Sequence, residues 1–137
     1  MCISTIPTLD FHKRLSLTSI SSLTIWGSFW GHECRIADGN EWDIWDDINQ
    51  HWVPTGIACH PKSNSWNHLT IQVQRTPNNQ LLYQSITLNG VTGTVNQYYN
   101  PGSTEGWYGV TINYQMDGNY EQSPYTVYLD DLTFTSE

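Results

Sequence analysis

The sequence predicts an all-β protein, an antiparallel β-sandwich, and two observations carry that prediction. Charged side chains make up only 13% of the 137 residues and aromatic side chains another 13%, while Thr, Asn, Gln, Ser and Tyr are abundant. This composition is typical of pleated sheets and polar loops. From residue 65 onward, short alternating segments are separated by polar turns, which indicates a sandwich or barrel with one core.

The clearest alternation lies in the segment SWNHLTIQVQR, residues 65–75. Leu69, Ile71 and Val73 alternate with polar residues, so one face of the predicted strand is apolar and the other carries hydrogen-bonding groups. A second strand is expected over residues 81–90. It contains Asn89-Gly90, a pair that favours the positive backbone angles of a two-residue hairpin turn.

The same alternation predicts strands over residues 107–116 and 125–135. In the last strand the apolar positions change phase between Leu129 and Leu132. One inserted residue near Asp130-Asp131, a β-bulge, is expected to return both apolar sets to the core.

The first 28 residues show weak alternation or none. We therefore divide the chain into an N-terminal segment, residues 1–28, for which no structure is predicted, and a β-sandwich domain, residues 29–137. Polar and charged residues at positions 10 and 12–14 interrupt the place where the apolar part of a secretory signal should lie. No signal peptide is visible in this chain.

Charge and hydropathy exclude two kinds of partner. Thirteen acidic against five basic side chains give a formal net charge of −8, which repels a phosphate backbone, so no nucleic-acid partner is expected. No stretch of about 18 apolar residues exists that could form a membrane span.

Three cysteines leave one thiol over whichever pair forms. Cys34 and Cys59 flank a tryptophan-rich segment, and a disulfide between them would stabilise the fold by about 3.5 kcal/mol in an oxidising compartment. One alternative is a zinc site in which His32 and His60 join the two cysteines. Buried free thiols are the other alternative.

Several landmarks resemble a known family. The order GHEC, WDIWDD, HWVPTGIAC, SWNHLTIQVQR, WYGVTINYQMDG and YTVYLDDLTFT is similar to that of secreted bacterial domains with the concanavalin A-like lectin/glucanase sandwich. The resemblance covers about residues 29–137. It implies a concanavalin A-like jelly roll and an extracellular or periplasmic location, but no enzymatic motif belongs to it.

The N-terminal part departs from this family. Such domains usually begin with a further half that contains an acidic strand pattern, and residues 1–28 do not match it. We expect the chain to be N-terminally truncated, with its original start and signal peptide upstream.

Residues 41–53, EWDIWDDINQHWV, hold three tryptophans and four carboxylates. Glu41, Asp43 and Asp46 resemble the E-x-D-x-x-E motif of laminarinase-type hydrolases, in which two carboxylates about 5 Å apart flank the scissile bond. In an unbulged strand, however, Asp46 points opposite to the other two. The favoured interpretation is a hairpin with residues 46–49 in its turn and Trp42 and Ile44 in the core; a calcium site using Asp43, Asp46, Asp47 or Asn49 is a further alternative. No other cofactor or metal is expected.

The better candidate for binding is a polar face shared by two predicted strands, an array of amides, hydroxyls and one imidazole with an indole at each end. Its members are Trp66, His68, Thr70, Gln72, Gln74, Trp107, Thr111, Asn113 and Gln115. Such a surface suits sugars, whose hydroxyls pair with amides and whose C–H faces stack on aromatic rings. The alternative is the solvated outer face of an antiparallel sheet.

The sequence thus predicts a non-catalytic carbohydrate-binding or carbohydrate-associated domain whose partner is a glycan or polysaccharide. One alternative is a glycoside hydrolase or polysaccharide lyase of the same fold. Another is a structural module that pairs with a second chain through an exposed edge strand.

Overall fold

The computed structural model of the chain describes residues 8–14, 19–25, 28–36, 39–102, 110–116 and 127–135, with side chains for 29–36, 39–102 and 127–135. All regular structure in these ranges is β, and no helix occurs in them, which confirms the all-β prediction. In the same ranges, no segment forms a helix that could cross a bilayer.

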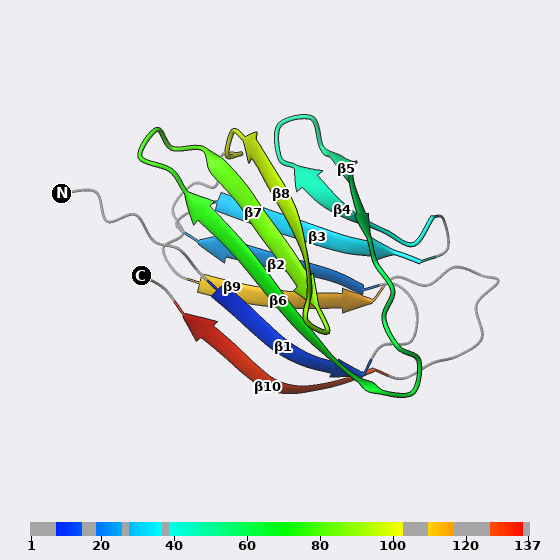
Figure 1. Cartoon of the computed structure of the whole chain (residues 1–137). Helices are drawn as coiled ribbons and strands as arrows, with labels where there is room; N and C mark the ends of the chain where they lie inside the picture. The colour runs from blue at the N-terminus through cyan, green and yellow to red at the C-terminus, as the bar shows by residue number, and fades with distance from the viewer. Residues whose placement is uncertain are drawn as a thin grey trace.

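Ten strands form two five-stranded sheets, and the pairings are antiparallel (Figure 1). The strands are β1 (Thr8–Arg14), β2 (Ser19–Ile25), β3 (Ser28–Arg35), β4 (Glu41–Asp46), β5 (His51–Ala58), β6 (Trp66–Arg75), β7 (Leu81–Leu88), β8 (Val91–Tyr99), β9 (Val110–Met116) and β10 (Tyr128–Thr135). The first sheet has the order β10-β1-β6-β7-β8 and the second has the order β5-β4-β3-β2-β9.

The N-terminal segment contributes to both sheets. Strand β1 lies between β10 and β6, and β2 lies between β3 and β9. Each is therefore an interior strand with neighbours on both sides, although its own sequence predicted no structure. Pairing with two stronger strands compensates for a weak local pattern.

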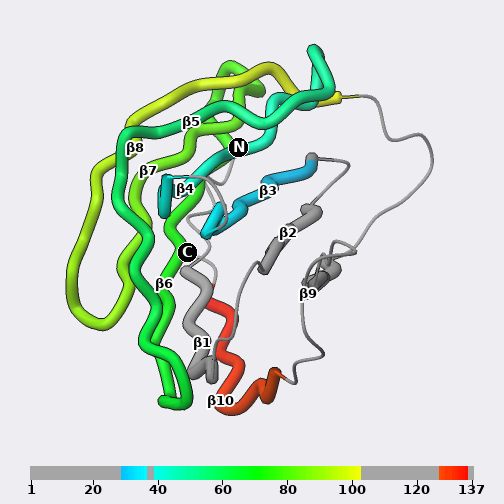
Figure 2. Tube along the Cα trace, turned by 90° about the vertical axis from the view of Figure 1, so that its right-hand side faces the viewer, coloured from blue at the N-terminus to red at the C-terminus, as the bar shows by residue number. Residues whose placement is uncertain are grey.

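The core lies between the two sheets. On β6, Leu69, Ile71 and Val73 are buried, as the alternation predicted. Trp30 on β3 and Trp42 on β4 meet them from the other sheet, and Figure 2 shows the layers of β6–β8 and of β3–β4 edge-on. Fully burying one such aliphatic side chain contributes about 1.5–3 kcal/mol, so this shared core holds the sheets together.

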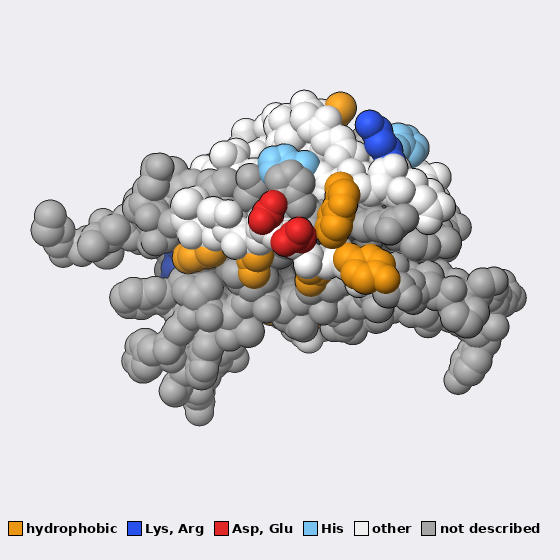
Figure 3. All heavy atoms as spheres, turned by 90° about the horizontal axis from the view of Figure 1, so that it is seen from below, with side chains coloured by type: hydrophobic (Ala, Val, Ile, Leu, Met, Phe, Trp, Pro, Cys, Tyr) orange, Lys and Arg blue, Asp and Glu red, His pale blue; other side chains and the backbone are white. Residues whose placement is uncertain are grey.

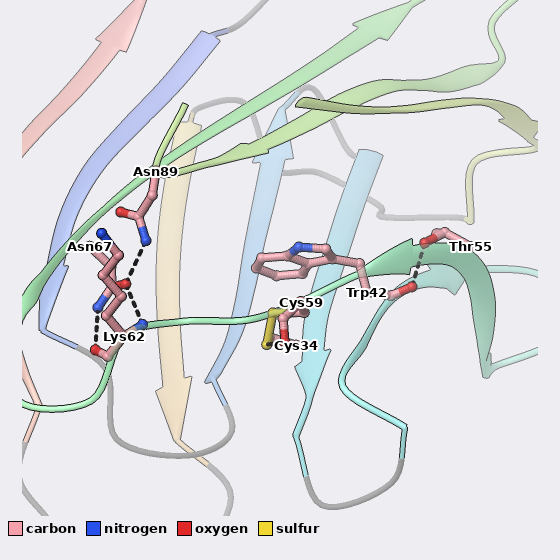
Figure 4. Close-up of a disulfide and its surroundings, with 7 residues drawn as sticks. All are labelled: Cys34, Trp42, Thr55, Cys59, Lys62, Asn67 and Asn89. Atoms are coloured by element: carbon pink, nitrogen blue, oxygen red, sulfur yellow. Dashed lines mark hydrogen bonds between the residues drawn. A yellow bond between two sulfur atoms is a disulfide. The ribbon is translucent and has the colours of Figure 1, made fainter. Parts of the chain in front are cut away.

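The predicted disulfide between Cys34 and Cys59 is present, with a Cα–Cα distance of 5.8 Å. It ties the end of β3 to the segment that follows β5, beside the buried Trp42 (Figure 4). The zinc alternative is thereby contradicted, because the disulfide uses both sulfur atoms; in addition, His32 is buried in the core while His60 is exposed.

Local turn chemistry was also predicted correctly. Asn89 and Gly90 have φ angles of 52° and 82°, the left-handed pair of a type I′ hairpin turn between β7 and β8. The Asn89 side chain donates to Asn67 over 2.8 Å (Figure 4). Asn67 is fully buried, and its amide also bonds both backbone groups of Lys62, at 2.7 and 2.8 Å. This side chain therefore anchors the loop before β6.

The predicted bulge in β10 is present as well. Two β10 residues, Asp131 and Leu132, oppose one residue of β1, and Asp131 has a φ of 51°. The expected return of both apolar sets to the core is wrong, however: Leu129 and Leu132 are 48% and 55% exposed, and only Phe134 packs against the core cluster. Strand β10 is the outermost strand of its sheet.

Candidate functional site

The polar row predicted on β6 exists. His68, Thr70, Gln72 and Gln74 alternate with the buried residues of the strand and lie on the outer face of the first sheet, with Trp66, 52% exposed, at one end. Cross-strand hydrogen bonds use several of these groups: Ser85 donates to Gln72 over 2.7 Å, and Gln84 donates to Gln74 over 3.1 Å. Neighbouring side chains therefore already satisfy part of this row, as in an ordinary solvated sheet face.

The second half of the predicted binding face is elsewhere. Thr111, Asn113 and Gln115 lie on β9, which belongs to the other sheet. The polar row of β6 points away from that sheet, because the apolar residues of β6 face it. One continuous floor across β6 and β9 is therefore not formed, and this prediction is wrong. Trp107 lies outside the described residues.

The segment 41–46 forms β4, and the hairpin interpretation is confirmed. Trp42 and Ile44 are buried in the core, whereas Glu41 and Asp43 lie on the outer face of the second sheet. Asp46 has the opposite phase and closes the turn: its carboxylate accepts from the backbone amides of Ile48 and Asn49, both at 3.0 Å. The three carboxylates of the hydrolase-like motif therefore do not share one face.

Arg35 holds the two outer carboxylates of β4. Its Nε donates to Asp43 over 2.8 Å, and its Nη2 donates to Glu41 over 3.3 Å. Glu41 also accepts from the backbone amide of Gly56, across the bulge in β5. Asp43 is only 3% exposed, so its charge needs this partner. The cluster Arg35, Glu41 and Asp43 is called the ion-paired cluster below.

The carboxylates proposed as calcium ligands do not converge on one point. Asp43 bonds Arg35 on one face, while Asp46 bonds Asn49 over 2.7 Å on the other. Within the described part of the chain, no group of three His, Cys, Asp or Glu side chains is placed to hold a metal ion.

The pKa values of the two adjacent turn carboxylates, Asp46 and Asp47, are shifted in opposite directions. Hydrogen bonds from the side chain and backbone of Asn49 lower the pKa of Asp46. Burial raises the pKa of Asp47, although hydrogen bonds from Gly102 and Phe29 and an interaction with the Trp45 side chain offset part of the increase. Asp47 thus connects the turn, the start of β3 and the Trp45 side chain.

Next to the ion-paired cluster lie two tryptophans that the binding prediction did not include. Trp45 on β4 is the cross-strand partner of Trp52 on β5. Their ring centroids are 5.1 Å apart and the ring planes meet at 66°. Both rings are half-buried. We call this pair the tryptophan corner.

Gly31 on β3 makes room for the tryptophan corner. A Cβ atom at this position would lie 2.7 Å from the Cβ of Trp45 and 3.2 Å from Cη2 of Trp52. Any larger residue would therefore displace one of the two tryptophans. The signal was present in the sequence as tryptophans on both sides of a short turn, but their contact with Gly31 depends on the pairing of β3 with β4.

Tyr83 supports this region from the core side. Its hydroxyl group accepts a hydrogen bond from the Gly31 amide at 3.1 Å and donates one to the Trp45 carbonyl at 3.0 Å. Burial raises the pKa of Tyr83 well above its ordinary value, so the hydroxyl stays protonated and able to donate. Because Tyr83 belongs to β7, these bonds connect the two sheets directly beneath the tryptophan corner.

Backbone register relates the β9 residues to this site. Asn113 pairs with Ser22, which pairs with Gly31. Gln115 is linked in the same way, through Ile20 and Glu33, to Asp43. The β9 positions predicted to bind ligand therefore share their cross-strand rows with Gly31 and Asp43, and not with β6.

These features define the chain as a two-sheet, all-β domain with an aromatic pair and an ion-paired cluster on one outer face. No family model, curated protein or solved structure matches the chain.

Proposed function

We propose that the protein is a non-catalytic carbohydrate-binding domain with a concanavalin A-like sandwich, and that its site is the outer face of β3, β4 and β5. The tryptophan corner beside the ion-paired cluster is the observation that carries the proposal. It combines, on the adjacent strands β3, β4 and β5, the aromatic and polar groups that sugars require.

The chemistry of each group supports this assignment. A pyranose presents C–H groups on its ring faces, which pack on an indole ring, and hydroxyls around its edge, which need donors and acceptors. Arg35 supplies donors and Glu41 supplies acceptors, since their side chains are 26% and 25% exposed, while the buried Asp43 holds Arg35 in place. Because the three groups already hold one another, little side-chain entropy is lost when a sugar binds.

A secreted location, extracellular or periplasmic, is part of this proposal. The disulfide between Cys34 and Cys59 is consistent with folding in an oxidising compartment. An acidic protein that binds neutral sugars also avoids non-specific binding to nucleic acid, since its net charge is −8.

A hydrolase is the weaker candidate on geometric grounds. A retaining mechanism needs two carboxyl groups about 5 Å apart on the same side of the scissile bond. Asp46 lies on the opposite side of β4 from Glu41 and Asp43 and is occupied by the turn amides. Glu41 and Asp43 share Arg35 as their partner, and no described contact brings Asp46 to them.

A glycan array tests the proposal, with wild type beside Trp52→Ala and Trp66→Ala. The two variants each remove an accessible indole, but from different sheets, so Trp66→Ala is the matched control. We expect wild-type binding to at least one glycan, a loss of about tenfold or more in Trp52→Ala, and little change in Trp66→Ala. Absence of any glycan signal, or a loss confined to Trp66→Ala, would refute the assignment of this site.

A second candidate function, assembly through an edge strand, is favoured by one observation on β10. This strand is the last of its sheet and exposes Tyr128, Leu129 and Leu132, at 54%, 48% and 55%. Figure 3, which views the molecule from below, shows orange apolar side chains beside red acidic ones on one face. Exposed apolar edges can pair with another chain, although a bulge of the kind found in β10 opposes such pairing.

Sedimentation equilibrium tests this second candidate. If β10 mediates assembly, wild type should dimerise with concentration and Leu132→Lys should remain monomeric. Val91→Lys is the control, because Val91 is also exposed but lies at the β7–β8 hairpin, away from β10. A monomer at all concentrations would remove this candidate.

A further inference from the structure

We infer that the tryptophan corner binds the terminal sugar of a soluble glycan and not the flat face of an extended polysaccharide. This inference rests on the proposed function and specifies its ligand class. It follows from the angle between the two rings, from the contacts that maintain that angle, and from the position of the pair in its sheet.

The two rings of the tryptophan corner are steeply inclined to each other. An extended polysaccharide offers one long, nearly flat surface, which is bound best by aromatic rings that lie parallel to it. The planes of Trp45 and Trp52 meet at 66° with centroids 5.1 Å apart. If one indole lies flat against a sugar ring, the other must stand up beside it and contact its edge. The pair therefore encloses one pyranose from two sides.

The ring angle is held by contacts on several sides. The Cβ of Trp45 lies directly above Gly31, as does the rim of the Trp52 ring. Tyr83 bonds the backbone carbonyl of Trp45 from below, and the Asp47 carboxylate interacts with the Trp45 side chain. Edge-to-face contact is also a favoured geometry for aromatic pairs. Tyr83 and Gly31 fix the backbone and the Cβ of Trp45, and rotation to a coplanar arrangement would break the interaction of Asp47 with the Trp45 side chain or move the Trp52 ring from its place over Gly31.

The position of the tryptophan corner at the edge of its sheet also favours the binding of a single terminal sugar. Trp52 lies on β5, the outermost strand of the second sheet, and only one residue pair separates the corner from the β4–β5 turn. A polymer crossing the strands would leave the protein directly after Trp52. On the inner side, Asp43 is two residues from Trp45 on the same face of β4, about 7 Å away along the strand. Asp43 holds the partly exposed Arg35 there, so the polar groups that could bond hydroxyls, Arg35 and Glu41, lie on the side of the corner away from the β4–β5 turn.

The length of the oligosaccharide distinguishes a site for one terminal sugar from a site for an extended polysaccharide. A site for one terminal sugar should bind all oligomers of a series with similar affinity. A site for an extended chain should gain affinity with every added unit that it contacts, because each further contact contributes free energy.

Isothermal titration calorimetry measures this with cello-, laminari-, xylo-, manno- and chito-oligosaccharides of two to six units, alongside sedimentation with microcrystalline cellulose and chitin. For the series that binds, we expect affinity to change by less than about threefold from dimer to hexamer. Blocking one end of the oligomer, by reduction or by methylation of the terminal hydroxyl, should lower affinity by about tenfold or more. Trp52→Ala should abolish binding, and Trp66→Ala should not.

Two results separate the failure of this inference from the failure of the proposed function. If affinity rises more than about tenfold from dimer to hexamer, or if the insoluble polymers retain wild type but not Trp52→Ala, carbohydrate binding stands and the terminal-sugar inference is wrong. If neither the oligosaccharides, the insoluble polymers nor the glycan array give any binding, both are wrong.

Discussion

His32 is expected to make folding stability depend on pH. It is 1% exposed, and burial lowers its pKa from 6.5 to about 3. Its ring meets Tyr83 edge-on, with centroids 5.0 Å apart, and its Nε2 has no hydrogen-bond partner among the residues that the structure describes. The folded protein therefore keeps this imidazole neutral, whereas the unfolded chain takes up a proton as soon as the pH falls below the ordinary pKa.

The size of the effect follows from the two pKa values. Stability is fully present above pH 6.5, where both states are neutral, and it is lost as the pH falls from 6.5 toward 3. Each pH unit in this window costs about 1.4 kcal/mol, so about 2 kcal/mol of the free energy of unfolding should be lost at pH 5.0. Above pH 6.5, His32 should contribute no pH dependence.

Urea unfolding followed by tryptophan fluorescence at pH 7.5 and pH 5.0 measures this loss in wild type, His32→Leu and His60→Asn. His32→Leu will change stability at both pH values, so the informative quantity is the difference between the two. We expect this difference to shrink by about 2 kcal/mol in His32→Leu. His60 is exposed, so His60→Asn should keep the wild-type difference. An unchanged difference in His32→Leu would refute the reasoning. So would NMR spectra of the folded protein in which the His32 imidazole titrates near pH 6.5.

Three further predictions concern the framework of the site. Gly31→Ala should place a Cβ against Trp45, destabilise the protein by about 1–3 kcal/mol and weaken glycan binding, as measured by urea unfolding and calorimetry. Replacing Cys34 and Cys59 together with serine should cost about 3.5 kcal/mol and lower the urea midpoint, whereas a midpoint equal to that of wild type would show that the disulfide does not stabilise the fold. Asn67→Ala should cost about 2–3 kcal/mol or more, because it leaves buried backbone groups unpaired; a loss below about 0.5 kcal/mol would contradict the proposed anchoring role.

Much of the local structure was predictable because its causes are local. The hairpin at Asn89-Gly90 depends on two residues that tolerate positive φ. The buried face of β6 depends on an alternation that any half-buried strand shows. The disulfide depended on few choices, since the chain has only three cysteines.

The binding face was predicted in part and assembled wrongly. Strands β6 and β9 carry the same alternation of apolar and amide residues, and that pattern says nothing about which sheet each strand joins. Trp45 and Trp52 were not included in the predicted binding face, because the importance of their position depends on a glycine in a different strand. The exposure of Leu129 and Leu132 was missed for a related reason: alternation identifies a face of a strand, but not whether any other segment covers it.

The sequence by itself determined that this chain is all-β, where several strands and turns lie, and that Asp46 points away from Glu41 and Asp43, and it favoured a disulfide between Cys34 and Cys59. Those properties arise from backbone sterics, residue alternation and short-range hydrogen bonds. Only the tertiary structure decided that residues 8–14 and 19–25 are interior strands, that β6 and β9 belong to different sheets, and that Gly31 lies under two tryptophans. These are contacts between segments distant in sequence, and they depend on which strands pair and on how the two sheets cover each other, which no single segment encodes.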